Sequence, residues 1–280
     1  MTAISPDLTL VHPRRAAPGR LSAIRTLAGR RLALTTRTPR ELLVPLLTPV
    51  LFALVIAPAL KAALHTGVAY ESAVAVGTVG LLIPLNTMFA GLSVIVDRES
   101  GARRELLAAP IGRPLIVVGN LLVAVATTAL QVGALLAVAE ARRIHFHVTA
   151  TGALWFIGVA ALLAVAMYGI AETLAGRVPR AEEYIARVPA IAIVPWFLAG
   201  SLFPITALPL VMQWVARFLP LTHAMALMRY GLLGDSSGLE HIWRGGAPTT
   251  MAFLSLLVVG AFAALATVAS IRVFTKAAVR

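Results

Sequence analysis

The sequence contains no cysteine and little charge, and these two absences exclude several classes of protein. Without cysteine among 280 residues, disulfides, thiolate metal sites and cysteine catalysis are excluded. Only 13% of the residues are charged and 59% are hydrophobic, whereas a soluble domain has about 25% charged and roughly 45–50% apolar residues. A water-soluble fold could not bury this excess of apolar surface, so we expect lipid to surround most of the chain.

Long apolar runs without charge predict transmembrane helices rather than the alternating strands of a β-barrel. A helix needs about 20 apolar residues to cross the hydrocarbon. The predicted fold is therefore an all-α membrane protein in which residues 41–280 form a six-helix transmembrane domain. The six expected spans are 42–60, 73–96, 115–139, 152–171, 188–204 and 250–271.

The fifth run is too long for one simple span. It carries no charge from residue 188 to residue 216, and four prolines interrupt it, namely Pro189, Pro195, Pro204 and Pro209. We therefore expect a short re-entrant or interfacial segment after the fifth span, reaching to about residue 222.

The first forty residues do not resemble a signal peptide, because arginines run through them and no apolar core interrupts these. Residues 1–20 are polar and contain proline, which predicts a disordered cytoplasmic arm. Residues 21–40 predict a basic amphipathic helix in the membrane interface, with a solvated charged arm as the alternative. The apolar positions at helical spacing are Leu21, Ile24, Leu27, Ala28 and Leu32.

The net charge of +12 could indicate nucleic-acid binding or the positive-inside bias of a membrane protein. The basic residues form no single patch but sit in short segments between the apolar runs, which favours the membrane and argues against a nucleic-acid partner. If the amino terminus is inside, the inner segments hold 18 of the 24 basic residues. This distribution predicts that both termini are cytoplasmic, although Arg142 and Arg143 then lie on the outer side.

The segment between the second and third spans, residues 97–114, is dense in charge of both signs. Glu99 and Arg103 are four residues apart, a spacing that supports a helix and places both on one side. Pro110 and Pro114 end this segment. A short charged helix parallel to the membrane would suit docking of a cytoplasmic partner, and an ordinary solvated loop is the alternative.

Two stretches carry distinctive residues. The first stretch comprises Asp97, Arg98, Glu99, Gly101, Glu105, Leu106 and Pro110. The second stretch comprises Gly200, Phe203, Pro204, Pro209, Pro220, Thr222 and Arg229. Together they resemble the permeases of type-2 ABC exporters, the drug and polysaccharide exporter class. The resemblance covers roughly residues 20–275. Ala102 stands where the family often has threonine, and His223 stands where tyrosine is common.

The resemblance implies one half of a dimeric pore, with a second permease copy or a paralogue as the other half, in the lipid of the plasma membrane. It also implies cytoplasmic ABC ATPase subunits as partners, because this chain has no Gly-x-x-x-x-Gly-Lys phosphate loop. ATP and Mg²⁺ would then be bound by the partner, and the chain would be no enzyme. The residues implied to couple to the ATPase are Asp97, Arg98, Glu99, Gly101, Arg103, Glu105 and Pro110.

Other functions remain open. A secondary drug–proton antiporter would need a titratable group within a span, and Glu172 is the candidate; pairing with Arg177 or an arginine of the arm is its structural alternative. A non-transporting membrane assembly protein is a further possibility. An intramembrane hydrolase is disfavoured, because the spans contain no Ser-His-Asp arrangement and no metal-binding motif. His145 and His147 are expected to be loop histidines, so no metal site is predicted. The sequence does not identify the substrate, which could be a drug, a lipid or a glycan.

Overall fold

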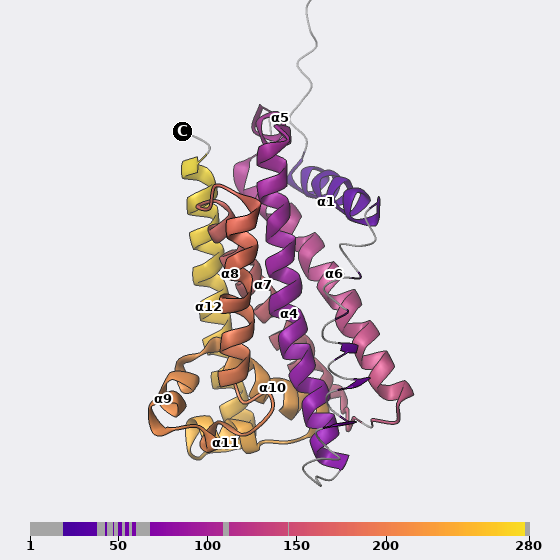
Figure 1. Ribbon diagram of the computed structural model, residues 1–280, viewed down its shortest axis with the longest axis vertical. Coiled ribbons are helices and arrows are strands. Elements are labelled where there is room, and N and C mark those ends of the chain that lie inside the picture. The colour runs from indigo at the N-terminus through magenta and orange to yellow at the C-terminus, as the bar shows by residue number, and fades with distance from the viewer. Residues whose placement is uncertain are drawn as a thin grey trace, which may run out of the picture.

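The computed structural model describes residues 19–37, 68–108, 112–144 and 146–277, together with isolated positions between 43 and 59. Within these residues the chain is helical and has no strand, in agreement with the predicted all-α fold (Figure 1). The elements in chain order are α1 (Arg20–Arg37), α4 (Val68–Glu99), α5 (Ala102–Ala108), α6 (Arg113–Ala141), α7 (Ala150–Ala175), α8 (Ala181–Leu198), η2 (Ile205–Ala207), α9 (Leu210–Phe218), α10 (Pro220–Leu233), α11 (Ser237–Trp243) and α12 (Pro248–Ala277).

Four helices are long and apolar enough to cross a membrane, namely α4, α6, α7 and α12. They contain the predicted spans 73–96, 115–139, 152–171 and 250–271, so these four predictions are confirmed. The predicted first span, 42–60, lies largely outside the described residues. The chain is thus a multi-pass membrane protein.

The bounds predicted for the fifth span, 188–204, were wrong. Helix α8 begins at Ala181 and ends at Leu198, so it starts before the uncharged run and stops short of Pro204. Its first turns carry charge, including Glu182 and Glu183, and it contains two prolines. The chain turns at Gly200, whose φ of +79° lies in the left-handed region that favours glycine.

The core of the bundle is built around α7, which packs against α4, α10 and α12. Small residues allow the helices to approach closely: a Cβ placed on Gly169 of α7 would lie 2.7 Å from the backbone carbonyl carbon of Ala266 in α12. Close packing at small residues is a main source of helix association in lipid, where apolar side chains gain little from leaving the lipid.

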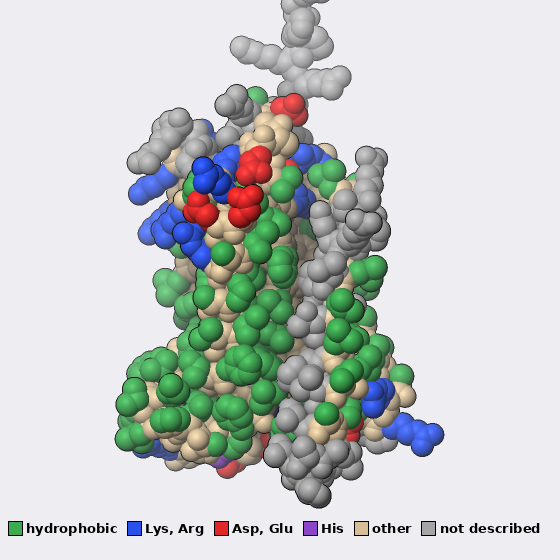
Figure 2. All heavy atoms as spheres, in the orientation of Figure 1, with side chains coloured by type: hydrophobic (Ala, Val, Ile, Leu, Met, Phe, Trp, Pro, Cys, Tyr) green, Lys and Arg blue, Asp and Glu red, His purple; other side chains and the backbone are tan. Residues whose placement is uncertain are grey.

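The two ends of the molecule differ in character. Helices α1 and α5 and the carboxyl end of α12 lie at one end, and α9, α10 and α11 lie at the other (Figure 1). Figure 2 shows basic and acidic side chains gathered at the α5 end, with hydrophobic side chains covering the face below it. We call these the charged end and the opposite end.

The segment predicted as re-entrant or interfacial, reaching to about residue 222, contains η2, α9 and the first residues of α10. Helix α9 exposes large apolar side chains, including Val211 and Phe218. Helix α10 follows directly, with Pro220 at its first position, and its residues Leu221–Met228 are all buried. The opposite end is therefore closed by a buried helix that does not span the bundle.

Candidate functional site

At the charged end, Asp97 joins α4 to α1. Its Oδ2 lies 3.4 Å from Nη1 of Arg31, and its Oδ1 lies 4.0 Å from Nη2 of Arg30. The side chains of Arg31 and Asp97 are 14% and 13% exposed, whereas that of Arg30 is 40% exposed. The shielded pair, Asp97 with Arg31, is therefore the stronger of the two links.

The next residue, Arg98, joins α4 to the turn between α7 and α8. Its Nη1 donates to the carbonyl of Ala175 (3.1 Å), and its Nη2 donates to the carbonyls of Val178 and Pro179 (both 2.8 Å). The last carbonyls of a helix have no partner within the helix, and positive charge is favourable at that end. The guanidinium of Arg98 thus stabilises the carboxyl end of α7 while holding it against α4.

Gly101 separates α4 from α5, so the predicted docking helix is divided between two helices. Its φ of +80° interrupts the helix, so α4 ends at Glu99 and Arg103 lies in α5. The prediction that these two residues share one helix was wrong, because a residue in the left-handed region interrupts the helix between them. Both Glu99 and Glu105 are exposed at the charged end. The side chain of Arg103 and the whole of Pro110 lie outside the described residues.

Helix α1 is fixed to the bundle beside α5. Its Ala23 and Leu27 are buried, and a Cβ on Gly119 of α6 would lie 2.9 Å from the Cβ of Leu27. Leu27 belongs to an apolar cluster with α6 and Phe274 of α12, against which Leu106 of α5 packs. The charged end therefore links α1, α5, α6 and α12 through one small core.

At the opposite end, the loop after α8 is held by hydrogen bonds to backbone carbonyls. The indole Nε1 of Trp196 donates to the carbonyl of Gly77 in α4 (2.7 Å), and Oγ of Ser201 donates to the carbonyl of Trp196 (2.7 Å). Nη2 of Arg229 in α10 donates to the carbonyl of Ser201 (2.8 Å). The loop is thus tied to α4 on one side and to α10 on the other.

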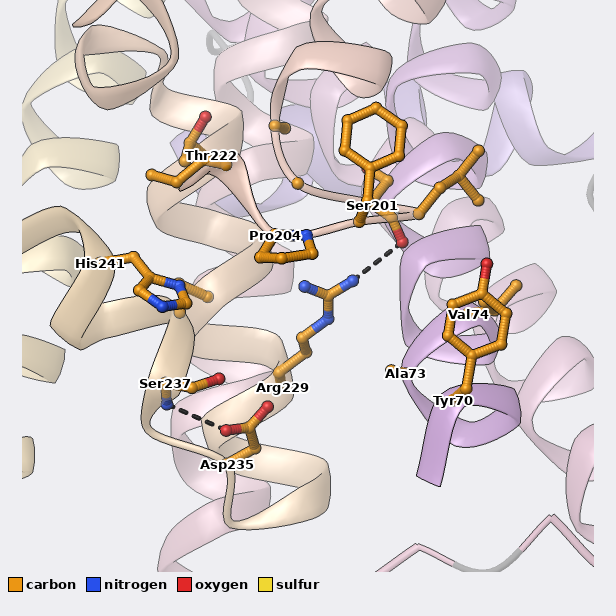
Figure 3. A pocket seen from close by; sticks show the side chains of 17 residues that line it. Tyr70, Ala73, Val74, Ser201, Pro204, Thr222, Arg229, Asp235, Ser237 and His241 are labelled. Carbon is orange, nitrogen blue, oxygen red and sulfur yellow. Dashed lines mark hydrogen bonds between the residues drawn. The ribbon is translucent and has the colours of Figure 1, made fainter. Parts of the chain in front are cut away.

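This loop borders a cavity of about 310 Å³ at the opposite end. Arg229 extends from α10 into it, between Ser201, Tyr70 and Asp235 (Figure 3). Five of the seven residues in the second stretch of the resemblance line this cavity. Pro209 instead lies directly before α9, and Pro220 begins α10. The five are Gly200, Phe203, Pro204, Thr222 and Arg229.

Tyr70, Asp235 and His241 also line the cavity, and sequence reasoning missed them. Tyr70 lies at the start of α4, whereas Asp235 and His241 lie near α11, more than 160 residues later. The sequence carries no local signal that brings positions so far apart into one site.

His223 lies nearby in a buried chain of hydrogen bonds. Its Nε2 faces the carbonyl of Arg217 (2.9 Å) and must therefore be the protonated nitrogen, while its Nδ1 lies 3.3 Å from Oγ of Ser255. Nε1 of Trp243 donates to the same Oγ at 2.9 Å. Burial lowers the pKa of His223 from its ordinary value of 6.5, and the hydrogen bond to the Arg217 carbonyl opposes this shift.

Two remaining candidates are placed by the structure. Glu172 is 2% exposed within α7, so the titratable group considered from the sequence is buried in the bundle. His147 is exposed, and His145 lies outside the described residues. Among the residues that the structure describes, no group of three or more His, Asp or Glu side chains could hold a metal ion.

The chain resembles known proteins over most of its length. Residues 22–233 match the ABC-2 type transporter family. The chain is 29% identical over 176 residues to Nodulation protein J of Rhizobium leguminosarum bv. viciae, covering 60% of this chain and 65% of that protein. It is 31% identical over 175 residues to Nodulation protein J of Rhizobium leguminosarum bv. trifolii, covering 60% of this chain and 64% of that protein. The matched region thus spans slightly less than two thirds of these relatives.

Proposed function

Because the chain belongs to the ABC-2 type transporter family, we propose that it is the permease subunit of an ATP-driven exporter, forming one half of a dimeric translocation path. In this proposal separate cytoplasmic ABC ATPase subunits bind ATP and Mg²⁺, since these 280 residues include no phosphate-binding loop. The charged end lies on the cytoplasmic side of the cell membrane, and so do both termini.

One observation carries the proposal: consecutive residues at the end of α4 bind two other parts of the bundle. Asp97 binds α1 through Arg31, and Arg98 binds the carboxyl end of α7. Helix α5 follows immediately; Glu99 ends α4 before it, Glu105 lies within it, and both are exposed. A force on α5 would reach α1, α4 and α7 together, as a coupling element requires.

The surface of the spans supports a hydrophobic or amphipathic substrate. Large apolar side chains are exposed along α6, α7 and α12, including Leu130, Leu154 and Leu265. Such a surface suits lipid and a second permease copy, and an apolar path between two copies would accept a drug, a lipid or a glycan with an apolar part.

The test is co-purification of the permease with candidate ABC ATPases in lipid nanodiscs, followed by ATP-dependent substrate movement in vesicles. Charge reversal by Glu99→Lys with Glu105→Lys should abolish ATPase docking while the permease remains folded. The matched control is Glu140→Lys, an exposed carboxylate at the far end of α6, which should dock normally. Normal docking and transport by the double variant would exclude α5 as the coupling element.

The same vesicles separate the exporter from an antiporter. Transport that continues when the proton gradient is collapsed but stops without ATP supports the exporter. Transport that needs the proton gradient rather than ATP, and that is lost in Glu172→Gln, would overturn the exporter proposal and support the antiporter.

A further inference from the structure

Helix α9 at the opposite end carries a wide apolar surface for so short a helix. It comprises the nine residues Leu210–Phe218, of which only Ala216 is buried. Its large apolar side chains are between 46% and 80% exposed, and they are Leu210, Val211, Met212, Trp214, Val215 and Phe218. With about 3.6 residues per turn, these positions cover roughly 200° of the helix surface. Helix α9 thus presents an apolar face that the described part of the chain does not cover.

The position of α9 brings this face to the edge of the membrane. In Figure 1 the helix projects sideways from the bundle at the opposite end, where the long spans also begin or end. In the same orientation, Figure 2 shows hydrophobic side chains covering this part of the molecule. A short helix with exposed apolar and aromatic side chains at the end of the spans is typical of the depth at which lipid headgroups lie.

Two arginines border this face at Trp214. The Cζ atom of Arg217 lies 5.2 Å from the centroid of the Trp214 ring, and the Cζ atom of Arg244 lies 5.6 Å from it. Arg217 is in the last turn of α9, whereas Arg244 caps the carboxyl end of α11. Within the part of the chain that the structure describes, neither guanidinium forms an ion pair or a hydrogen bond. One indole ring therefore brings together two cations from separate helices, with no carboxylate to neutralise them.

An anionic lipid complements this surface better than a second copy of the chain does. The phosphate of a lipid headgroup supplies oxygen acceptors for both guanidinium groups, and its acyl chains supply apolar neighbours for α9. A second copy that met α9 with its own α9 would bring four arginines together, and like charges repel each other. A zwitterionic lipid carries a cation beside its phosphate, so we expect it to bind more weakly than an anionic one.

We propose that Trp214, Arg217 and Arg244 form a binding site for the headgroup of an anionic phospholipid, whose acyl chains lie against the apolar face of α9. The inference rests on the proposed function only in assigning this site to the outer leaflet. Because α9 begins directly after Pro209, the bound lipid would also fix the preceding loop, which borders the cavity, to the membrane surface.

The test uses the fluorescence of Trp214 in the full-length permease reconstituted into vesicles. Phospholipids brominated on their acyl chains quench tryptophan at short range, so quenching reports which lipid lies beside the indole. The signal of Trp214 is the difference between each protein and the same protein carrying Trp214→Phe. Vesicles of phosphatidylcholine contain either brominated phosphatidylglycerol, which is anionic, or brominated phosphatidylcholine at the same mole fraction.

We expect brominated phosphatidylglycerol to be enriched beside Trp214 by at least about fivefold over brominated phosphatidylcholine. Arg217→Gln combined with Arg244→Gln should abolish this enrichment, while both lipids still quench because the apolar face still meets acyl chains. Thermal unfolding checks the folding of this double variant. Arg244→Gln alone changes an exposed side chain and should reduce the enrichment at least about twofold, which keeps the test decisive if the double variant does not fold.

The matched control is Arg143→Gln. Like Arg244, Arg143 is exposed, follows the last residues of a helix at the opposite end, and has a positive φ, +62° against +60°. It is not in contact with the Trp214 ring, so the enrichment should be the same as in the unaltered protein.

Enrichment of the anionic lipid that is lost with Arg217 and Arg244 but kept in Arg143→Gln supports the proposal. Quenching by neither lipid would overturn it, because protein such as a second copy would then cover α9. Equal quenching by both lipids in the unaltered protein, enrichment that survives in the folded arginine variants, or an equal loss in Arg143→Gln would also overturn it. ATP-driven transport is measured separately: transport without lipid enrichment refutes this inference alone, and enrichment without ATP-driven transport refutes the exporter alone.

Discussion

The indole Nε1 of Trp196 in α8 donates a 2.7 Å hydrogen bond to the backbone carbonyl of Gly77 in α4, 119 residues earlier in the chain. At the other end of α8, the hydroxyl of Tyr184 donates to the carbonyl of Met88 at 2.6 Å. Both side chains are fully buried. Two aromatic side chains thus fix α8 along α4 and set the position of the loop that borders the cavity at the opposite end.

Replacing Trp196 by Phe should destabilise the permease by about 2 kcal/mol, because it removes the bond to Gly77 and leaves a cavity in the core. Thermal unfolding in detergent measures the change. The same substitution at Trp214, which is 49% exposed on α9, is the control and should shift the melting temperature little. Equal effects at the two tryptophans would show that the Trp196 bond does not hold α8.

Replacing Arg98 by Ala should loosen the turn between α7 and α8, since three carbonyls lose their donor. We expect a destabilisation of about 2 kcal/mol, and Arg98→Lys should restore only part of it because a lysine cannot reproduce the fork of an arginine. Limited trypsin digestion reports the loosening directly, as cleavage after Arg177 or Arg180 in the turn. An unchanged digestion rate in Arg98→Ala would contradict this account.

The control for that experiment is Arg187→Ala. Arg187 is exposed on α8 and forms only a surface ion pair with Glu183 at 3.8 Å. Such pairs contribute about 0–1 kcal/mol, so the rate of cleavage in the turn should not change.

Sequence reasoning located the four long spans because their signal is local: about 20 apolar residues in a row must lie in lipid. It misplaced the fifth span because it began the span at the first uncharged run, residue 188, whereas α8 begins at Ala181 and carries Glu182 and Glu183 in its first turn. It also joined Glu99 and Arg103 into one helix, because spacing alone does not reveal that Gly101 takes a positive φ.

The second stretch was located by resemblance, but the cavity that it lines was not. Arg229 was identified as a motif residue, whereas its partners in space, Tyr70 and Asp235, come from distant segments. Their approach depends on how α4, α10 and α11 pack, and that arrangement is set by buried contacts that no local pattern encodes.

The two arginines beside Asp97 should differ in their contributions. Arg31→Ala should destabilise the attachment of α1 by about 1–3 kcal/mol, because it leaves a shielded carboxylate without its nearest charge. Arg30→Ala should cost less than about 0.5 kcal/mol, since that pair is longer and its arginine is exposed. A double-mutant cycle with Asp97→Asn, read by thermal unfolding, gives each coupling energy. Equal couplings would contradict the asymmetry seen in the structure.

The stability of the permease should fall as the pH drops below about 6.5, through His223. Burial lowers the pKa of this histidine in the folded protein, so below its ordinary value of 6.5 the unfolded chain takes up a proton that the folded protein does not. The slope contributed by this one group approaches about 1.4 kcal/mol per pH unit and levels off once the pH is below the folded pKa.

The measurement is the melting temperature between pH 7.5 and pH 5, compared between the unaltered protein and His223→Gln. Glutamine can still bond to the carbonyl of Arg217 but does not titrate, so the variant should lose this part of the pH dependence. The control is His147→Gln, because His147 is exposed and should leave the profile unchanged. A protein whose stability rises on acidification, or whose profile is the same in His223→Gln, would show that burial does not hold His223 neutral.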